Sequence, residues 1–74
     1  MESKEQIKAH FGRHFKKLLL ERDISLRGLA TLSGLEYTQV QRIAVGKVNL
    51  TLTTIYALAK GLNIPAANLL TELE

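Results

Sequence analysis

Apolar residues along this chain recur at the three- and four-residue spacing of helices rather than at the two-residue spacing of strands. The pattern predicts five helices, at 4–22, 26–33, 37–45, 52–62 and 66–72, and no strand. The first helix carries one apolar stripe on an otherwise basic surface: Ile7, Phe11, Phe15, Leu18 and Leu19. We therefore expect an all-α fold, with residues 1–74 forming a single compact domain.

Several residues are suited to begin or end these helices. Ser25 is a good N-cap for the second helix and Thr51 for the fourth, because a hydroxyl oxygen can accept from an open amide of the first turn. Asn63 can end the fourth helix, and Pro65, with its fixed backbone angle, can begin the fifth. Gly12 lies inside the first helix, where glycine lowers helix propensity.

The fourth helix leaves mainly Thr53, Thr54 and Lys60 on its outer side. The positions expected to face the core are Leu52, Ile55, Tyr56, Leu58, Ala59 and Leu62.

The second and third helices have the spacing of a helix-turn-helix. Ala30 is small enough for another helix to cross closely over it. Gly34 follows the last turn of the second helix, where a left-handed backbone costs glycine nothing sterically. Leu35 turns back into the core, and Val40 and Ile43 share the inner face of the third helix. Such a pair can place its second helix in a DNA groove.

The third helix turns polar side chains outward and then stops. Gly46 is suited to end it, and Lys47 lies near its carbonyl end, where a cation is favourable. The outward side chains can touch bases or phosphates: Tyr37, Thr38, Gln41 and Arg42.

Length and composition narrow the class of protein. With 74 residues, the chain can hold one modest core but not a DNA reader and a separate effector-binding domain. It has no cysteine, so neither disulfides nor thiolate metal ligands support the fold. No apolar run approaches 18 residues, and the N-terminus lacks the form of a secretion signal. We expect a cytoplasmic protein that does not enter a membrane.

The net charge of +3 is unevenly distributed. Residues 8–47 hold eight basic and three acidic side chains, a net of +5, whereas residues 48–74 have a net of −1. The basic half contains the helix pair, as expected of a protein that binds a polyanion. A solvated helix face is the alternative interpretation of basic runs such as Arg13, Lys16 and Lys17.

Candidate metal and catalytic residues are few. His10 and His14 are four residues apart on the first helix, so their rings can share a face and bind a metal. No third ligand is evident, and two histidines on a solvated helix face are the simpler interpretation. No serine, histidine and aspartate are placed as a nucleophile with its base, and no glycine-rich phosphate loop is present. We expect neither catalysis nor a cofactor.

The stretch 24–47, ISLRGLATLSGLEYTQVQRIAVGK, followed by LTTIYALAKGLNI at 52–64, resembles the Cro/CI-type (XRE family) helix-turn-helix domain. The likeness covers roughly residues 11–70. It implies a lambda-repressor-like domain of five helices that binds double-stranded DNA. Members of this family are usually homodimers that repress transcription in bacteria or their phages.

The chain departs from the family pattern at several positions. Leu26 stands where the family often has a glutamine that bonds a DNA phosphate, which leaves that contact to Arg27 or Ser25. Ala44 replaces a frequent glutamate, and Leu50 a frequent proline. Gly28, inside the second helix, costs about 1 kcal/mol relative to alanine.

The resemblance places base contacts at the start of the third helix, on Tyr37, Thr38, Gln41 and Arg42. The fork of Arg42 matches the O6 and N7 acceptors of guanine. A phosphate contact, or an ion pair with Glu36 or Glu21, is the alternative. Tyr37 can pack on a thymine methyl or bond a phosphate, or it can support the turn as a partly buried ring.

The resemblance also implies contacts to the DNA backbone, which position a protein without reading sequence. The candidates are Ser25, Arg27, Lys47, Asn49 and Thr51. For Lys47, a plain loop lysine is the alternative. The candidates for a dimer contact, most of which also suit the core, are Leu50, Ile64, Leu69, Leu70 and Leu73.

Two functions follow from these residues. The first is a homodimeric regulator that reads a near-palindromic operator with two recognition helices about 34 Å apart. The second is a helical protein-interaction module that kept the fold and lost DNA binding, as Leu26, Ala44 and the low net charge suggest. No small-molecule effector site is expected in either case.

Overall fold

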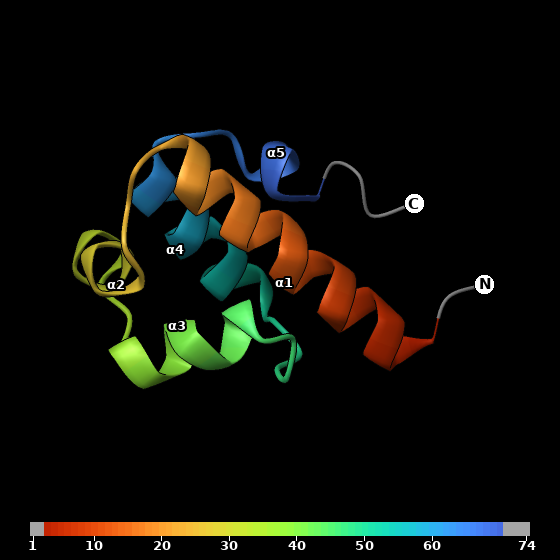
Figure 1. Ribbon diagram of the computed structural model, residues 1–74. Helices are drawn as coiled ribbons and strands as arrows, with labels where there is room; N and C mark the ends of the chain where they lie inside the picture. The colour runs from red at the N-terminus through yellow and green to blue at the C-terminus, as the bar shows by residue number, and fades with distance from the viewer. Residues whose placement is uncertain (1–2, 71–74) are drawn as a thin grey trace.

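The computed structural model describes residues 3–70, which form five helices and contain no strand (Figure 1). The helices are α1 (Lys4–Glu21), α2 (Leu26–Ser33), α3 (Tyr37–Ala44), α4 (Leu52–Leu62) and α5 (Ala66–Leu70). The predicted all-α fold and the order of its elements are confirmed. Helices α1 and α3 each end one residue earlier than predicted, and positions 71–72 of the predicted fifth helix lie outside the described residues.

The capping residues act as their side chains predict. The Ser25 hydroxyl accepts from the amide of Gly28 at 2.9 Å, and the Thr51 hydroxyl accepts from the amide of Thr54 at 3.2 Å. Asn63 ends α4 with a left-handed backbone, φ 58°. The chain enters α5 at Pro65, whose carbonyl oxygen accepts from the amide of Asn68 at 3.0 Å. These local bonds account for the lengths of α2, α4 and α5.

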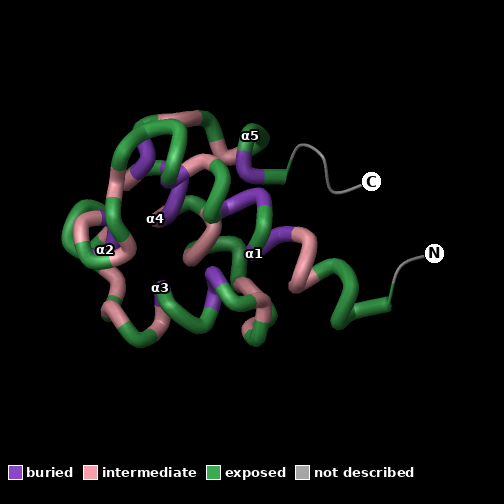
Figure 2. Tube along the Cα trace, viewed as in Figure 1, coloured by how far each residue is buried: buried purple, intermediate pink, exposed green. Residues whose placement is uncertain are grey.

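The core lies where all five helices meet. Helix α4 packs against α2 and α5, and α1 packs against α3 and α5. Figure 2 shows the buried segments of the helices turned toward one another at this centre. Val40 and Ile43 are buried on the inner face of α3, as their spacing predicts, and Leu35 packs against the core from the turn. The largest fully buried side chains are Phe15, Leu29, Val40, Ile43, Leu58, Leu62 and Leu69.

The sequence pattern predicted more core-facing positions on α1 and α4 than the structure buries. Leu52 and Tyr56 on α4 are 70% and 61% exposed, and Ile7 on α1 is also exposed. The apolar residues of α4 extend around a wider part of the helix surface than the part that α2 and α5 cover. The first turns of α1 extend past the other helices (Figure 1), which leaves Ile7 at the surface.

Helix α1 crosses the end of α3 at very close range. A Cβ atom at Gly12 would lie 2.7 Å from the carbonyl oxygen of Ala44, and one at Gly46 would lie 2.8 Å from Cα of Ala9. The glycine inside α1 is therefore explained by packing. Ala44, which stands where the family often has glutamate, is a buried core residue.

Gly46 stops α3 as predicted. Its backbone is left-handed, φ 75°, a conformation that glycine adopts without steric penalty. The amide of Lys47 then donates to the carbonyl oxygen of Arg42 at 3.0 Å. None of the helices formed by residues 3–70 is long and apolar enough to cross a membrane.

Candidate nucleic-acid interface

A tight turn sets the angle between α2 and α3. Gly34 has a left-handed backbone, φ 77°, and its amide donates to the carbonyl oxygen of Ala30 at 3.0 Å. The next amide, that of Leu35, donates to the same oxygen at 3.1 Å. Because the Leu35 side chain then packs on the core, the start of α3 is held in place from both sides of the turn.

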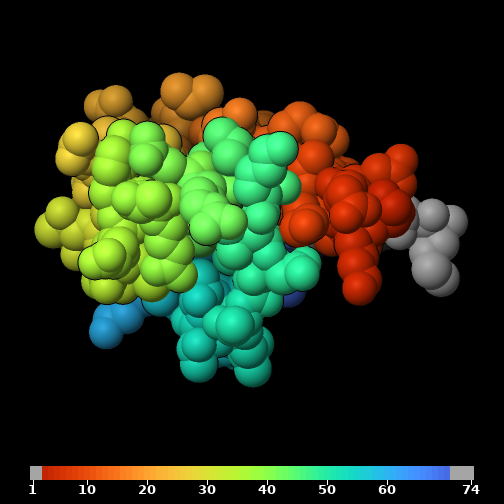
Figure 3. All heavy atoms as spheres, turned by 90° about the horizontal axis from the view of Figure 1, so that it is seen from below, coloured from red at the N-terminus to blue at the C-terminus, as the bar shows by residue number. Residues whose placement is uncertain are grey.

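Helix α3 lies at the surface with its polar side outward. Thr38, Gln41 and Arg42 are exposed, while Val40 and Ile43 anchor the opposite side in the core. Figure 3 looks onto this side of the molecule, where α3 and the loop that follows it lie next to each other, with α2 on one flank and the start of α1 on the other. The predicted base-contacting residues thus share one accessible surface.

Tyr37 joins two of the predicted contact residues. Its ring is half-buried and packs against the core, and the Arg27 guanidinium carbon of α2 lies 4.1 Å from the ring centroid. Its hydroxyl accepts from Nε2 of Gln41, one turn along α3, at 3.1 Å. The geometry agrees with the interpretation of Tyr37 as a partly buried ring that supports the turn.

Arg42 is exposed and lines a hollow of about 280 Å³ in the same surface, together with Glu36, Thr38, Gln39 and Val48. Within residues 3–70, no ion pair joins Arg42 to Glu36 or Glu21. Gln39 was not among the predicted contact residues, although it lies three residues before Arg42 on the same helix and lines the same hollow.

The predicted backbone contacts divide into two groups. Arg27, Lys47 and Asn49 are exposed. Ser25 and Thr51 are exposed as well, but both hydroxyls already accept from helix amides, and that of Thr51 also lies 2.9 Å from the Thr54 hydroxyl. Two exposed cations, Arg27 before α3 and Lys47 after it, thus accompany Arg42 on α3 itself.

The family model of the helix-turn-helix family HTH_3 matches residues 15–69, most of the chain. The protein belongs to the Cro/CI-type helix-turn-helix family. Members of this family are DNA-binding transcription regulators. A comparison with curated protein sequences finds no match.

Two solved structures of restriction-modification controller proteins superpose closely on the chain. The restriction-modification controller protein C.AhdI from Aeromonas hydrophila is 33% identical, with a TM-score of 0.79 over 82% of this chain and 92% of that chain. The restriction-modification controller protein C.Esp1396I is 25% identical, with a TM-score of 0.81 over 90% and 86%.

A third structure is similar in fold. An HTH_3 family transcriptional regulator from Vibrio cholerae is 24% identical, with a TM-score of 0.85 over 90% of this chain and 38% of that chain. The same five-helix arrangement therefore also occurs as part of a longer regulator.

Leu26, the main departure from the family's contact pattern, is half-buried and packs against the core. An alkyl side chain has no donor for a phosphate oxygen, so it cannot replace the family's glutamine. Arg27, the next residue along this helix-turn-helix, is exposed and carries such donors.

The leucines and isoleucine predicted for a dimer contact have different environments. Leu69 is fully buried and therefore cannot contact a partner, which corrects the prediction for this residue. Leu50 and Ile64 are half-buried against the core, and Leu70 is 46% exposed. Leu73 lies outside the described residues.

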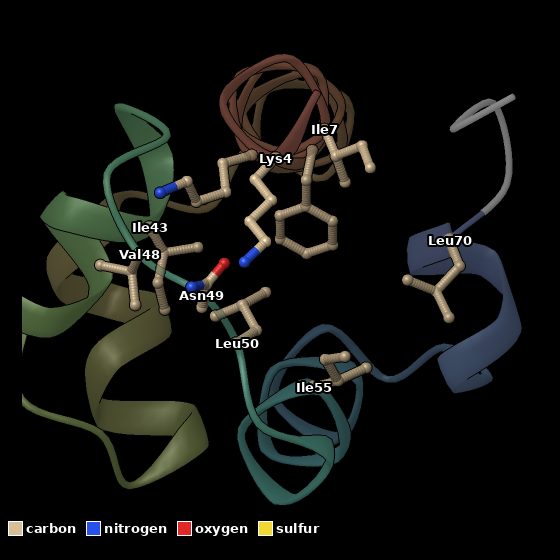
Figure 4. Close-up of a pocket in the computed structure, with 10 residues that line it drawn as sticks. Lys4, Ile7, Ile43, Val48, Asn49, Leu50, Ile55 and Leu70 are labelled. Carbon is tan, nitrogen blue, oxygen red and sulfur yellow. The ribbon is translucent and has the colours of Figure 1, made fainter. Parts of the chain in front are cut away.

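An apolar groove of about 470 Å³ lies beside the helix-turn-helix, between α1, the loop before α4, α4 itself and α5. Leu50 and Leu70 reach it from opposite sides, as Figure 4 shows, with Lys4 and Asn49 close to its centre. The groove also borders Ile55 of α4. Leu52 and Tyr56, which are exposed, lie on the same helix as Ile55.

The expectation of two solvated histidines on α1 is wrong for His14. This side chain is only 8% exposed, and its Nε2 lies 2.9 Å from the carbonyl oxygen of Asn68 on α5. The phase of α1 places His14 next to Phe15, on the side that α5 covers. Among residues 3–70, no group of three or more histidine, cysteine, aspartate or glutamate side chains could hold a metal ion.

Proposed function

We propose that the protein is a homodimeric transcriptional repressor that recognises a near-palindromic DNA operator through α3. The observation that carries this proposal is the division of α3, with Val40 and Ile43 in the core and Thr38, Gln41 and Arg42 exposed together. Similarity to two restriction-modification controller proteins supports a regulatory function. In this proposal residues 1–74 act as one DNA-binding domain in the bacterial cytoplasm.

The exposed residues of α3 read the bases in this proposal. Arg42 has no competing ion pair with Glu36 or Glu21 among residues 3–70, so its fork is available for O6 and N7 of guanine. Thr38 and Gln41 contact neighbouring base edges. Tyr37 lies at the start of the same surface, where its ring edge can meet a thymine methyl.

The flanking residues bind the DNA backbone. Arg27, Lys47 and Asn49 donate to phosphate oxygens from the two ends of the helix-turn-helix. The Ser25 hydroxyl accepts from the Gly28 amide with a lone pair, so its own hydrogen is left to donate to a phosphate. Thr51 lies at the start of α4, where open amides favour an anion.

A second copy of the chain completes the operator contact. A two-fold axis would place the two recognition helices about 34 Å apart, in successive major grooves. The exposed apolar stripe of α4, Leu52 and Tyr56, together with the adjoining groove and Leu70, is the proposed contact between protomers. Burial of such side chains in a dimer removes apolar surface from water.

Leu26 and Ala44 were the residues that favoured a protein-interaction module without DNA binding. Both pack against or within the core, so their apolar character has a structural cause in the protomer itself. One measurement distinguishes the DNA-binding regulator from the protein-interaction module. The module would not shift random duplex DNA even at low salt.

The decisive experiment is binding to a selected operator over a range of salt concentrations. Arg42→Ala is expected to relax the preference at one base pair by about 1–3 kcal/mol, because one bidentate contact is lost. Lys47→Ala is expected to weaken binding to all sequences and to reduce the salt slope by about one. Lys16→Ala, which removes an exposed cation from α1, is the matched control. The proposal fails if Arg42→Ala and Lys47→Ala both bind every duplex as the parent does.

A further inference from the structure

Tyr37 contacts one predicted phosphate-binding residue and one predicted base-reading residue at the same time. We propose that Tyr37 is a positioning residue that holds Arg27 for the DNA backbone and sets the amide of Gln41 to recognise adenine. This inference rests on the proposed DNA-binding function and names the base class that Gln41 selects.

The first half of the inference concerns the ring. Tyr37 packs against the core, so its ring is a fixed platform, whereas Arg27 is an exposed and intrinsically flexible side chain on α2. The guanidinium carbon lies 4.1 Å from the ring centroid, well within the range of a cation–π interaction. That contact uses the ring's π electrons and leaves most of the five guanidinium N–H donors for a phosphate. Arg27 is therefore ordered before DNA binds.

The second half concerns the hydroxyl. Nε2 of Gln41 donates one of its two hydrogens to the Tyr37 hydroxyl at 3.1 Å. In this bond the amide nitrogen lies on the side of the tyrosine. When the hydrogen that it donates is the one anti to the carbonyl oxygen, the second N–H lies beside that oxygen, and the two face outward together as a donor beside an acceptor. Adenine presents the complementary pair in the major groove, the N7 acceptor beside the N6 amino donor.

Restricting the side chains of Arg27 and Gln41 before DNA binds affects the affinity for DNA as well as the preference for one base. An exposed glutamine or arginine otherwise loses rotamer freedom when it binds, at a cost of about 0.5–1.5 kcal/mol for each side chain. In this protein the two contacts to Tyr37 restrict both side chains in the free state. One residue thereby links α2 and α3 at the DNA surface, in addition to the turn at Gly34.

The two halves can be separated by substitution. Tyr37→Phe keeps the ring and removes only the bond to Gln41, whereas Tyr37→Leu removes both contacts and keeps an apolar side chain against the core. Gln41→Ala and Arg27→Ala define the full effect of losing each partner.

The experiment measures binding of each variant to the selected operator and to all of its single-base variants, over a series of salt concentrations. Tyr37→Phe is expected to reduce the preference for adenine at one position of each half-site by about two- to tenfold, with the salt slope unchanged. Tyr37→Leu is expected to show the same loss and also to reduce the salt slope by about one, as Arg27→Ala does. Added to Gln41→Ala, Tyr37→Phe should cause no further loss of preference.

The outcomes that overturn the inference are specific. If Tyr37→Phe keeps the parent's preference at every position, or if no position of the half-site prefers adenine through Gln41, the hydroxyl does not set the amide. If a folded Tyr37→Leu keeps the parent's salt slope, the ring does not hold Arg27. Either result leaves the proposed function standing as long as the parent binds a specific operator. A parent protein that binds no duplex contradicts the proposed function itself.

Discussion

Nε2 of His14 on α1 donates to the carbonyl oxygen of Asn68 on α5 at 2.9 Å. Because a carbonyl oxygen can only accept, the ring carries a hydrogen on Nε2. Helix α5 has five residues, too few to be stable as an isolated helix in water. The buried imidazole therefore joins the last helix to the first, across 54 residues of sequence.

Loss of this contact should destabilise the whole domain. His14→Ala removes a buried ring as well as a hydrogen bond, and we expect the free energy of unfolding to fall by about 2–4 kcal/mol. His14→Leu keeps apolar volume and should lose only about 1–2 kcal/mol. Urea unfolding measures both values, and Arg13→Ala, at the adjacent exposed position, should change stability by less than about 0.5 kcal/mol. A His14→Leu variant as stable as the parent, with unchanged hydrogen exchange in α5, would contradict the contact.

Gly12→Ala should destabilise the protein although alanine is the better helix former. The added Cβ would lie 2.7 Å from the Ala44 carbonyl oxygen, so α1 must move away from α3. We expect a net loss of about 1–3 kcal/mol in thermal or urea unfolding. Gly28→Ala is the comparison, since it gains the same helix propensity and its Cβ meets only side chains, the Ser25 hydroxyl at 3.1 Å and a methyl group of Ile24 at 3.7 Å. Equal stability of the two variants would show that α1 and α3 are not in close contact.

Replacement of Glu36 should improve both folding and DNA binding. This residue caps α3 but its side chain makes no cap hydrogen bond, and its carboxylate lies beside Thr38 and Arg42 on the proposed DNA surface. Glu36→Ser adds a capping hydroxyl, which should raise the free energy of unfolding by about 0.5–1 kcal/mol. It also removes a negative charge, so affinity for any duplex should rise, most strongly at low salt.

Two variants separate these effects. Glu36→Gln removes the charge and should tighten DNA binding without the gain in stability from a serine cap. Glu21→Gln removes a charge from the last residue of α1, which ends on the side of the molecule away from α3 (Figure 1), and should change neither. Unchanged binding by both Glu36 variants would place Glu36 outside the DNA contact.

Charges in the exposed stripe of α4 should separate the protomers. Leu52→Asp and Tyr56→Asp alter side chains that are 70% and 61% exposed, so the protomer should stay folded. We expect the dimer dissociation constant to rise at least about tenfold, because a carboxylate cannot lose its water without a large free-energy penalty. Sedimentation equilibrium measures this change. Leu20→Asp, at an 81% exposed position near the end of α1, is the control. Dimers that persist in both α4 variants would place the interface elsewhere.

The helices, most of their ends and the helix-turn-helix could be predicted from the amino-acid sequence alone. The residues that begin or end these helices do so through hydrogen bonds and backbone angles that involve residues within about five positions. They are Ser25, Gly34, Gly46, Thr51 and Asn63. Such local preferences do not depend on the rest of the fold, so they can be predicted from neighbouring residues alone. The polar side of α3 is equally local, because helical periodicity sets which side chains share a face.

Which parts of those faces are covered depends on the packing of the helices against one another. Periodicity grouped Leu52 and Tyr56 with the inner positions of α4, but α2 and α5 do not reach them. The burial of His14 depends on Asn68, and the glycine at position 12 depends on Ala44, partners that are far away in sequence. The contact between Arg27 and Tyr37 likewise requires the angle between α2 and α3. Burial and side-chain pairing depend on neighbours that the folded chain brings together, and this is the physical reason that sequence alone left them open.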